Sequence, residues 1–303
     1  MSTHLVKIVL MVAMTHGFRA LGRISNPRWA GLILGLPCTT AVALVGGGSD
    51  RGVDHALAMS GASLIGLAAA VALPVAYTRA ILFKLRLPWA ILAGVGSYLV
   101  VALTVSRLLP GGGEARLGIA LMAVLAAVFA VGRMPADEGT GEEPMRSLAR
   151  PISWTRAVRT IVPVGCLLAS LGLGESFGPE VGGLMSTFPG VTLSVLWLTH
   201  LESGPASALR MARALPSGNL GMVAFLATFR FACPGLGLAG GTVAGYIAAL
   251  AMLALVVSFD CLRDRTFRVW RRLRDSCRAE DADRPAWPRA SRRFSPWVEP
   301  CAW

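Results

Sequence analysis

Two prolines in apolar stretches of the chain are each followed three residues later by a threonine: Pro37 by Thr40, and Pro189 by Thr192. A proline inside a membrane helix leaves backbone carbonyl groups without their usual donors, and neighbours or a water-lined cavity must satisfy them. Broken helices of this kind surround the substrate sites of many carriers. The four residues are therefore candidates for a substrate pathway. The alternative is that the prolines are packing kinks and each threonine bonds back to its own helix.

A second group of polar candidates follows the prolines: Asp50 in one stretch, and His200 with Glu202 in the other. Each carboxylate stands two residues before a glycine, near the expected start of a helix. There it would cap the helix or interact with the helix dipole. The alternative is that the two carboxylates are gate residues. His200 is expected to be interfacial, and a proton relay is its alternative role.

Other chemistry is missing from the sequence. There is no HExxH motif, no P-loop and no GxGxxG in a strand–helix context, and the six cysteines have no CxxC spacing. All 17 acidic residues fall in loops, at expected helix ends or in the tail, which argues against a proton antiporter of the usual kind. We expect no enzymatic activity, no metal site and no cofactor.

The composition identifies the class of protein that must position these residues. Mean hydropathy is +0.60, with 54% hydrophobic and only 15% charged residues, which is too apolar for a soluble domain. Apolar runs also reach the roughly 20 residues that a helix needs to cross a bilayer. The sequence predicts an all-α fold: a polytopic helical membrane protein with about nine transmembrane helices, at residues 5–21, 29–46, 55–77, 89–109, 117–131, 156–173, 181–201, 206–229 and 236–259.

The chain also contains one stretch twice. Residues 27–77 return 152 positions later without a gap, so that Pro27 corresponds to Pro179 and Gly52 to Gly204. One helix between the two four-helix sets reverses the second, which predicts an inverted 4+1+4 repeat. The expected parts are a first four-helix repeat (1–110), a reversing helix (111–133), a cytoplasmic polar linker (134–153), a second four-helix repeat (154–260) and a basic cytoplasmic tail (261–303).

Basic residues are shared unequally between the two sides that nine helices would define. With the tail in the cytoplasm, thirteen of the 29 Lys and Arg residues lie in cytoplasmic loops, eleven lie in the tail and five lie outside. This bias predicts a multi-pass protein of the bacterial cytoplasmic (inner) membrane, with its N-terminus outside and its C-terminus inside. Orientation and anionic headgroups then explain the net charge of +12, so no nucleic-acid partner is expected.

The tail combines aromatic and basic residues at helical spacing. A helix lying in the inner headgroup layer would place the aromatic residues toward the acyl chains and the arginines toward anionic lipid headgroups. The alternative is a segment that binds a protein partner. The expected lipid-surface residues are Phe267, Trp270, Arg271, Arg272 and Arg274.

The second copy of the repeat resembles the GlpM-like group of small four-helix bacterial membrane proteins. The residues that carry the resemblance are Phe188-Pro189, Leu193, Leu196-Trp197 and Leu201-Glu202-Ser203-Gly204. It implies that the chain is a fused, inverted duplication of such a unit, and it carries over a suggested link to exopolysaccharide production but no catalytic residues. The architecture is also similar to the drug/metabolite transporter plan, in which small four-helix units are duplicated in opposite orientations. The glutamate that small multidrug transporters carry in their first helix is missing from the expected first helix here, residues 5–21.

These observations favour a transporter or permease-like protein with a pathway between inverted halves. Its substrate would be a small molecule that the sequence does not identify. The alternative is a non-transporting membrane scaffold, or an envelope or exopolysaccharide assembly factor, whose basic tail binds lipid or a partner. The lipid bilayer is the expected partner, and the chain could also associate with copies of itself as a homo-oligomer.

Overall fold

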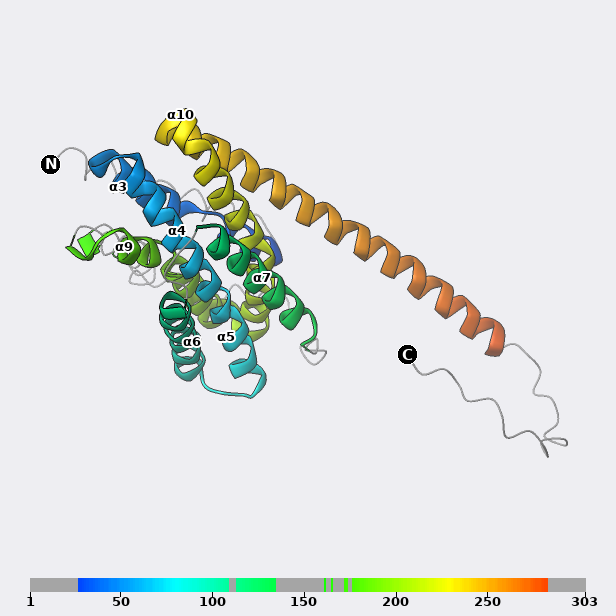
Figure 1. Ribbon diagram of the computed structural model, residues 1–303. Helices are drawn as coiled ribbons and strands as arrows, with labels where there is room; N and C mark the ends of the chain where they lie inside the picture. Colours follow the sequence, from blue (N-terminus) through cyan, green and yellow to red (C-terminus); the bar gives the residue numbers. More distant parts are fainter. Residues whose placement is uncertain are drawn as a thin grey trace. The chain divides into compact units, whose positions relative to one another are not determined.

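The computed structural model describes residues 27–108, 113–134 and 176–282, together with positions 161, 165 and 172–173. Every regular element in these ranges is a helix, which confirms the predicted all-α class (Figure 1). The helices are α2 (Pro27–Leu34), α3 (Cys38–Arg51), α4 (Val53–Ala70), α5 (Ala72–Leu82), α6 (Leu87–Leu108), α7 (Gly113–Gly132), α9 (Pro179–Ser186) and α10 (Gly190–Ala282).

Six helical stretches in the described part of the chain are long and apolar enough to cross a membrane. They are Gly31–Arg51, Val53–Leu82, Leu87–Leu108, Glu114–Gly132, Pro179–Leu201 and Ser203–Phe259. The predicted helix at 5–21 lies outside the described residues, and so does the helix at 156–173 except for positions 161, 165 and 172–173. The number of nine spans therefore stays a prediction.

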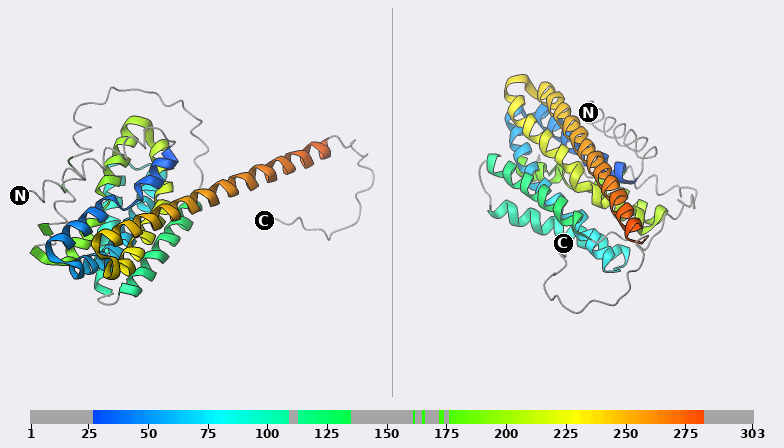
Figure 2. Two further views of the ribbon diagram at one scale, coloured as in Figure 1. Left: turned by 90° about the horizontal axis from the view of Figure 1, so that it is seen from above. Right: turned by 90° about the vertical axis from the view of Figure 1, so that its right-hand side faces the viewer.

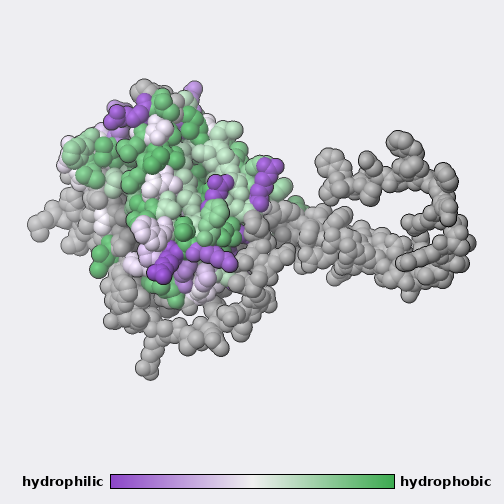
Figure 3. All heavy atoms as spheres, turned by 90° about the horizontal axis from the view of Figure 1, so that it is seen from below, coloured by the Kyte–Doolittle hydropathy of each residue, from purple (hydrophilic) through white to green (hydrophobic). Residues whose placement is uncertain are grey.

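Helices α6 and α7 expose apolar side chains. Only 22% of the apolar part of Leu87–Leu108 is buried, against 78% for Val53–Leu82, so the former is peripheral and the latter central. The exposed side chains include Trp89, Leu92, Val100, Leu103, Met122 and Phe129. Apolar residues also cover much of the face drawn in Figure 3. A surface of this extent is compatible with contact with lipid, since soluble monomers rarely carry one.

Helix α4 lies at the centre of the bundle, where it packs against α3, α6, α7 and α9 (Figure 1). Its buried residues occupy every side of the helix and are mostly alanine, glycine and serine. Small side chains allow neighbouring backbones to approach closely, which is how membrane helices gain packing energy. The composition of α4 therefore explains why four helices can surround it.

The chain leaves the helical conformation at Pro37, between α2 and α3, and at Pro189, between α9 and α10. Four backbone hydrogen bonds recur at the two breaks, all between 2.8 and 3.3 Å. The pairs are Gly35 to Leu32 and Thr187 to Leu184, Leu36 to Ile33 and Phe188 to Met185, Cys38 to Leu36 and Gly190 to Phe188, and Ala41 to Pro37 and Leu193 to Pro189. The two breaks thus have the same local backbone structure.

Glycines mark the other interruptions. Gly52, between α3 and α4, has φ 92° and ψ 172°, and Gly204, inside α10, has φ 81° and ψ 171°. Only glycine adopts this region readily, because a Cβ would clash with the backbone. Gly237 also leaves the helical conformation, with φ 70°. Helix α10 therefore consists of three helical segments, at residues 190–203, 205–236 and 238–282.

The second segment of α10 and residues 238–256 of the third form an antiparallel pair that turns at Gly237 (Figures 1 and 2). A Cβ built at Gly241 would lie 2.9 Å from the Cβ of Cys233, and one at Gly245 would lie 2.8 Å from the ring of Phe225. Residues at increasing distance after Gly237 therefore contact residues at increasing distance before it, as in a helical hairpin. The stretch Ser203–Phe259, which is 57 residues long, is thus folded back on itself.

Helices α2 and α9 each cross a distant segment at glycines. In each contact a Cβ added to the glycine would overlap an atom of its partner, so only glycine permits the approach. The pairs are Gly31 with Met211, Gly35 with Gly218, Gly183 with Met59 and Gly66 with Thr187. The first two join α2 to the second segment of α10, and the last two join α9 to α4.

The order of these contacts gives the directions of the helices. Residue numbers rise together in each pair of contacts, so α2 runs in the same sense as residues 211–218, and α9 runs in the same sense as α4. Helices α3 and α4 are antiparallel, since a Cβ at Gly48 would lie 2.9 Å from that of Ala56 across the break at Gly52. The span of α2 and α3 therefore runs opposite to α9.

The chain divides into two compact units, residues 1–256 and 257–303. In the second unit the backbone is helical from Val257 to Ala282. The side chains of residues 263–282 lie outside the described residues.

Candidate functional site

The carbonyl oxygen of Ser186, at the end of α9, accepts hydrogen bonds from threonines of α3. The distances are 3.2 Å from the hydroxyl of Thr39 and 3.1 Å from that of Thr40. This carbonyl is available because the amide of Gly190, its normal helical donor, bonds to Phe188 instead. Thr40 is fully buried. The break before α10 and the first turn after the break at Pro37 are therefore in direct contact.

Two more carbonyl groups at the end of α9 are contacted by hydroxyls of other helices, in addition to the local bonds from Ser186 and Thr187. The hydroxyl of Ser63 in α4 lies 3.2 Å from the carbonyl oxygen of Gly183 and 3.0 Å from the hydroxyl of Ser186. The hydroxyl of Tyr98 in α6 donates to the carbonyl of Leu184 at 2.9 Å. A buried polar group without a partner costs about 1–3 kcal/mol, so these hydroxyls stabilise the broken end.

The predicted pathway residues differ in their hydrogen-bond partners. Thr40 bonds across to another helix, which contradicts the alternative that it bonds back to its own. The carbonyl of Pro37 accepts from the hydroxyl of Tyr246 at 3.3 Å as well as from the Ala41 amide. Thr192, at the corresponding position after Pro189, is half-buried and makes no matching cross-helix bond within the described part of the chain.

Of the three predicted end residues, His200 has a defined side-chain partner. Its Nδ1 lies 2.7 Å from the hydroxyl of Tyr77, a fully buried residue of α5. Asp50 is exposed in the last turn of α3, and α4 begins after Gly52 with no side-chain hydrogen bond at its cap. The backbone of Glu202 is helical and lies two residues before Gly204, but its side chain lies outside the described residues.

The predicted lipid-surface residues fall in the helical part of the second unit, and their side chains lie outside the described residues. These are Phe267, Trp270, Arg271, Arg272 and Arg274. Among the residues whose side chains are described, no group of three or more His, Cys, Asp or Glu could hold a metal ion.

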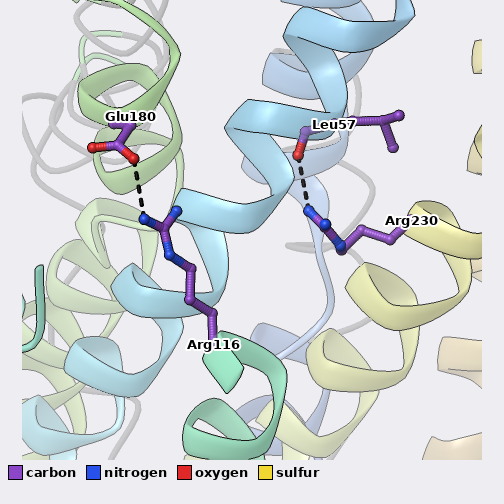
Figure 4. A network of polar contacts seen from close by, with 4 residues as sticks. All are labelled: Leu57, Arg116, Glu180 and Arg230. Carbon is purple, nitrogen blue, oxygen red and sulfur yellow. Dashed lines mark hydrogen bonds and ion pairs between the residues drawn. The ribbon is translucent and has the colours of Figure 1, made fainter. Parts of the chain in front are cut away.

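Arg116 and Arg230 fall just outside the predicted helices 117–131 and 206–229. In the structure both arginines converge on α4 (Figure 4). Arg116, near the start of α7, is 9% exposed, and its Nη2 donates to the carboxylate of Glu180 at 3.0 Å. Arg230 comes from the second segment of α10, and its Nη1 donates to the carbonyl of Leu57 at 3.1 Å. Both guanidinium groups flank Gly61: a Cβ there would lie 3.1 Å from Nη1 of Arg230 and 3.6 Å from Nη1 of Arg116.

This pair places two positive charges close together. Because both Nη1 atoms lie within 3.6 Å of one point, they are at most about 7 Å apart, where like charges repel by about 2 kcal/mol at an effective dielectric constant of about 20. The Glu180 carboxylate offsets part of this cost, but it is 68% exposed and correspondingly screened.

Sequence reasoning missed this site because it ended a helix at Phe229 and began the next at Leu236. The structure corrects that boundary, since the helix continues past Arg230 and turns at Gly237. Arg230 stands between Phe229 and Phe231 in an apolar run, and this pattern could have indicated an arginine inside a helix.

Comparison with known proteins finds no matching family model, no similar curated protein and no similar solved structure.

Proposed function

We propose that this chain is a permease-like transporter of the bacterial cytoplasmic membrane, built from two inverted repeats. The pathway would run between the halves, near the two helix breaks and their residues Pro37, Thr40, Pro189 and Thr192. The observation that carries the proposal is the contact between the breaks, through the bonds of Thr39 and Thr40 to the Ser186 carbonyl. Inverted-repeat carriers commonly place discontinuous helices at the interface of their repeats.

Three observations support the inverted repeat itself. The hydrogen-bond pattern at Pro37 recurs 152 residues later at Pro189. The glycine conformations at Gly52 and Gly204 agree within about 11° in φ. The crossings of α2 and α9 are reciprocal at the same offset, and the span of α2 and α3 runs opposite to α9.

Such an arrangement suits alternating access. Each short helix, α2 or α9, packs on the long helix of the other half through a glycine crossing, so neither half is complete alone. Rocking one half against the other would move both crossings together while the bonded breaks remain near the axis. The resemblance to GlpM-like proteins would make each half equivalent to one such four-helix unit.

The second candidate is a membrane scaffold or an envelope assembly factor. It is favoured by the basic tail, whose helical backbone extends to Ala282 and would lie on anionic lipid or on a partner.

A deletion strain complemented with three versions of the gene tests the proposal. Uptake and efflux are profiled with the wild type, with a Pro37→Ala/Pro189→Ala variant, and with a variant that ends at residue 260. Alanine supplies the backbone amide that proline lacks, so the double variant should restore helical bonding at the breaks and change transport.

Membrane insertion of each version is checked by the yield of folded protein. A transport defect in the double variant with an intact tail supports the transporter. A phenotype that appears only on loss of the tail favours the scaffold and contradicts the proposed pathway.

A further inference from the structure

We propose that Arg116 and Arg230, placed on either side of Gly61, form a binding site for a small oxyanion, a carboxylate or a phosphate. The site lies where α4, α7, α9 and the second segment of α10 meet (Figure 4). The identification of this ligand with the transported substrate rests on the proposed function. The presence of the anion site does not depend on that function.

Gly61 makes room for the two guanidinium groups. A Cβ at this position would lie 3.1 Å from Nη1 of Arg230, which is tighter than ordinary van der Waals contact. Either the arginine or the added methyl group would have to shift. A glycine here therefore lets the Arg230 guanidinium lie against the α4 backbone, while Arg116 at 3.6 Å is in ordinary contact range.

Arg230 supplies charge that the described residues do not neutralise. Its guanidinium makes one hydrogen bond, from Nη1 to the Leu57 carbonyl, and has no ion-pair partner within the described ranges. Nη2 and Nε keep donors for a ligand. The planar guanidinium fork matches the oxygen atoms of carboxylate and phosphate groups, which it can bind in bidentate fashion.

The Glu180 carboxylate indicates the kind of ligand that fits. It already binds Arg116 Nη2 at 3.0 Å, while 68% of its side chain is exposed. An incoming carboxylate or phosphate could therefore reach this edge from the surface and replace or join Glu180. Because Glu180 competes for the same cation, it would weaken binding of any free anion.

The depth of the site argues for a role beyond orientation in the bilayer. Gly61 lies eight residues after the start of α4, about 12 Å along the helix axis at 1.5 Å per residue. Arg116 lies three residues after the start of α7, and Glu180 lies one residue after the start of α9, so the site extends from the helix ends inward to Gly61. A buried arginine such as Arg116, which is 9% exposed, is costly within an apolar bundle and can mark a ligand or ion pathway.

The proposed repeat places a related residue pair in the other half. At the offset of 152, Gly61 corresponds to Arg213 and Arg230 corresponds to Thr78. The Thr78 hydroxyl is buried and has no hydrogen-bond partner among the described residues. Under the inverted repeat, arginines would then occupy corresponding places in both halves.

The test uses the purified full chain in detergent. Its thermal unfolding is followed with inorganic phosphate, with succinate, and with phosphatidylglycerol, each against sodium chloride at matched ionic strength. A ligand that binds only the folded state raises the unfolding temperature in a saturable way. We expect Arg230→Gln to weaken the apparent Kd about tenfold, the loss of one charge-assisted contact. Arg116→Gln should act likewise.

Two matched variants separate binding from structural effects. Arg107→Gln removes an exposed arginine of α6 and should leave the apparent Kd unchanged. Glu180→Gln should strengthen anion binding, because it removes the competing carboxylate. A purely structural ion pair predicts only a lower unfolding temperature for that variant.

Stabilisation by phosphate or succinate whose apparent Kd is weakened about tenfold in Arg230→Gln supports a site for a free anion. The same pattern with phosphatidylglycerol alone supports the site with a lipid headgroup as its ligand. No stabilisation by any of the three, or stabilisation with the same apparent Kd in Arg230→Gln as in the wild type, overturns the proposal. Since no transport is measured, none of these results depends on whether the protein is a transporter.

Discussion

At the residue scale, the two threonines after the prolines have different surroundings although their sequence positions correspond. Thr40 is buried and bonds to the Ser186 carbonyl, whereas Thr192 is half-buried. The Thr40 hydroxyl reaches the Ser186 carbonyl at 3.1 Å, whereas no corresponding bond from Thr192 is found among the described residues, although the backbone pattern at the two breaks is the same. Equal spacing therefore does not produce equal hydrogen bonding.

The Thr39→Val/Thr40→Val variant should lower stability. It leaves the buried Ser186 carbonyl without either hydroxyl donor, which we expect to cost about 1–3 kcal/mol of unfolding free energy. Unfolding of the purified protein in detergent measures the loss. Thr192→Val is the matched control and should change stability by less than about 0.5 kcal/mol. Equal losses in both variants would contradict the role assigned to the cross-helix bonds.

The glycine crossings predict a second pair of effects. Alanine at Gly31 would overlap the Met211 carbonyl, and alanine at Gly183 would overlap that of Met59, so each should destabilise the fold by about 1–3 kcal/mol. Gly96 in α6 has open space around its Cα, and Gly96→Ala should be neutral or stabilising by up to about 1 kcal/mol. Similar losses at the first two positions, measured by unfolding, would agree with equivalent crossings.

At the element scale, interruptions determine how the helices are used. Pro37 and Pro189 divide two spans into short helices, and Gly52, Gly204 and Gly237 set the points at which the chain turns. Each interruption has a local cause in one residue type. The sequence predicts the breaks at the prolines and the turns at Gly52 and Gly204, but not the turn at Gly237. The partner that satisfies the freed backbone groups cannot be predicted in this way, because it comes from a distant element such as α3 or α6.

Substituting Gly52 or Gly204 by alanine should strain the backbone. Both residues have positive φ with ψ near 172°, a region that costs a residue with a Cβ about 1–3 kcal/mol. Neither has atoms within 4 Å of an added Cβ, so the cost is conformational rather than steric contact with neighbours. Unfolding of the two variants measures it. Stability equal to that of the wild type would mean that the turns relax without cost.

At the scale of the whole molecule, apolar helices organise around a central helix of small residues. Helices α6 and α7 expose large side chains, and α4 is buried on every side. Composition alone indicates a membrane protein, but the orientation of the chain depends on the distribution of its arginines, which stays a prediction.

A fusion to the C-terminus checks that orientation. Green fluorescent protein attached after Trp303 should fluoresce, and alkaline phosphatase attached there should be inactive, because the basic tail is predicted to be cytoplasmic. Active phosphatase at this position would reverse the predicted topology. Arg116, which lies between the predicted fourth and fifth helices and is one of the five basic residues predicted to lie outside, would then lie on the cytoplasmic side.

The sequence by itself predicted the helical class and the breaks near Pro37, Pro189, Gly52 and Gly204, but not the turn at Gly237. These features follow from local composition, from prolines that lack an amide, and from the conformations that only glycine adopts. Only the tertiary structure brought Thr40 to Ser186, and Arg116 and Arg230 to Gly61. Such contacts join residues 55 to 169 positions apart in the chain. They depend on how whole helices cross, which no local pattern of residues specifies.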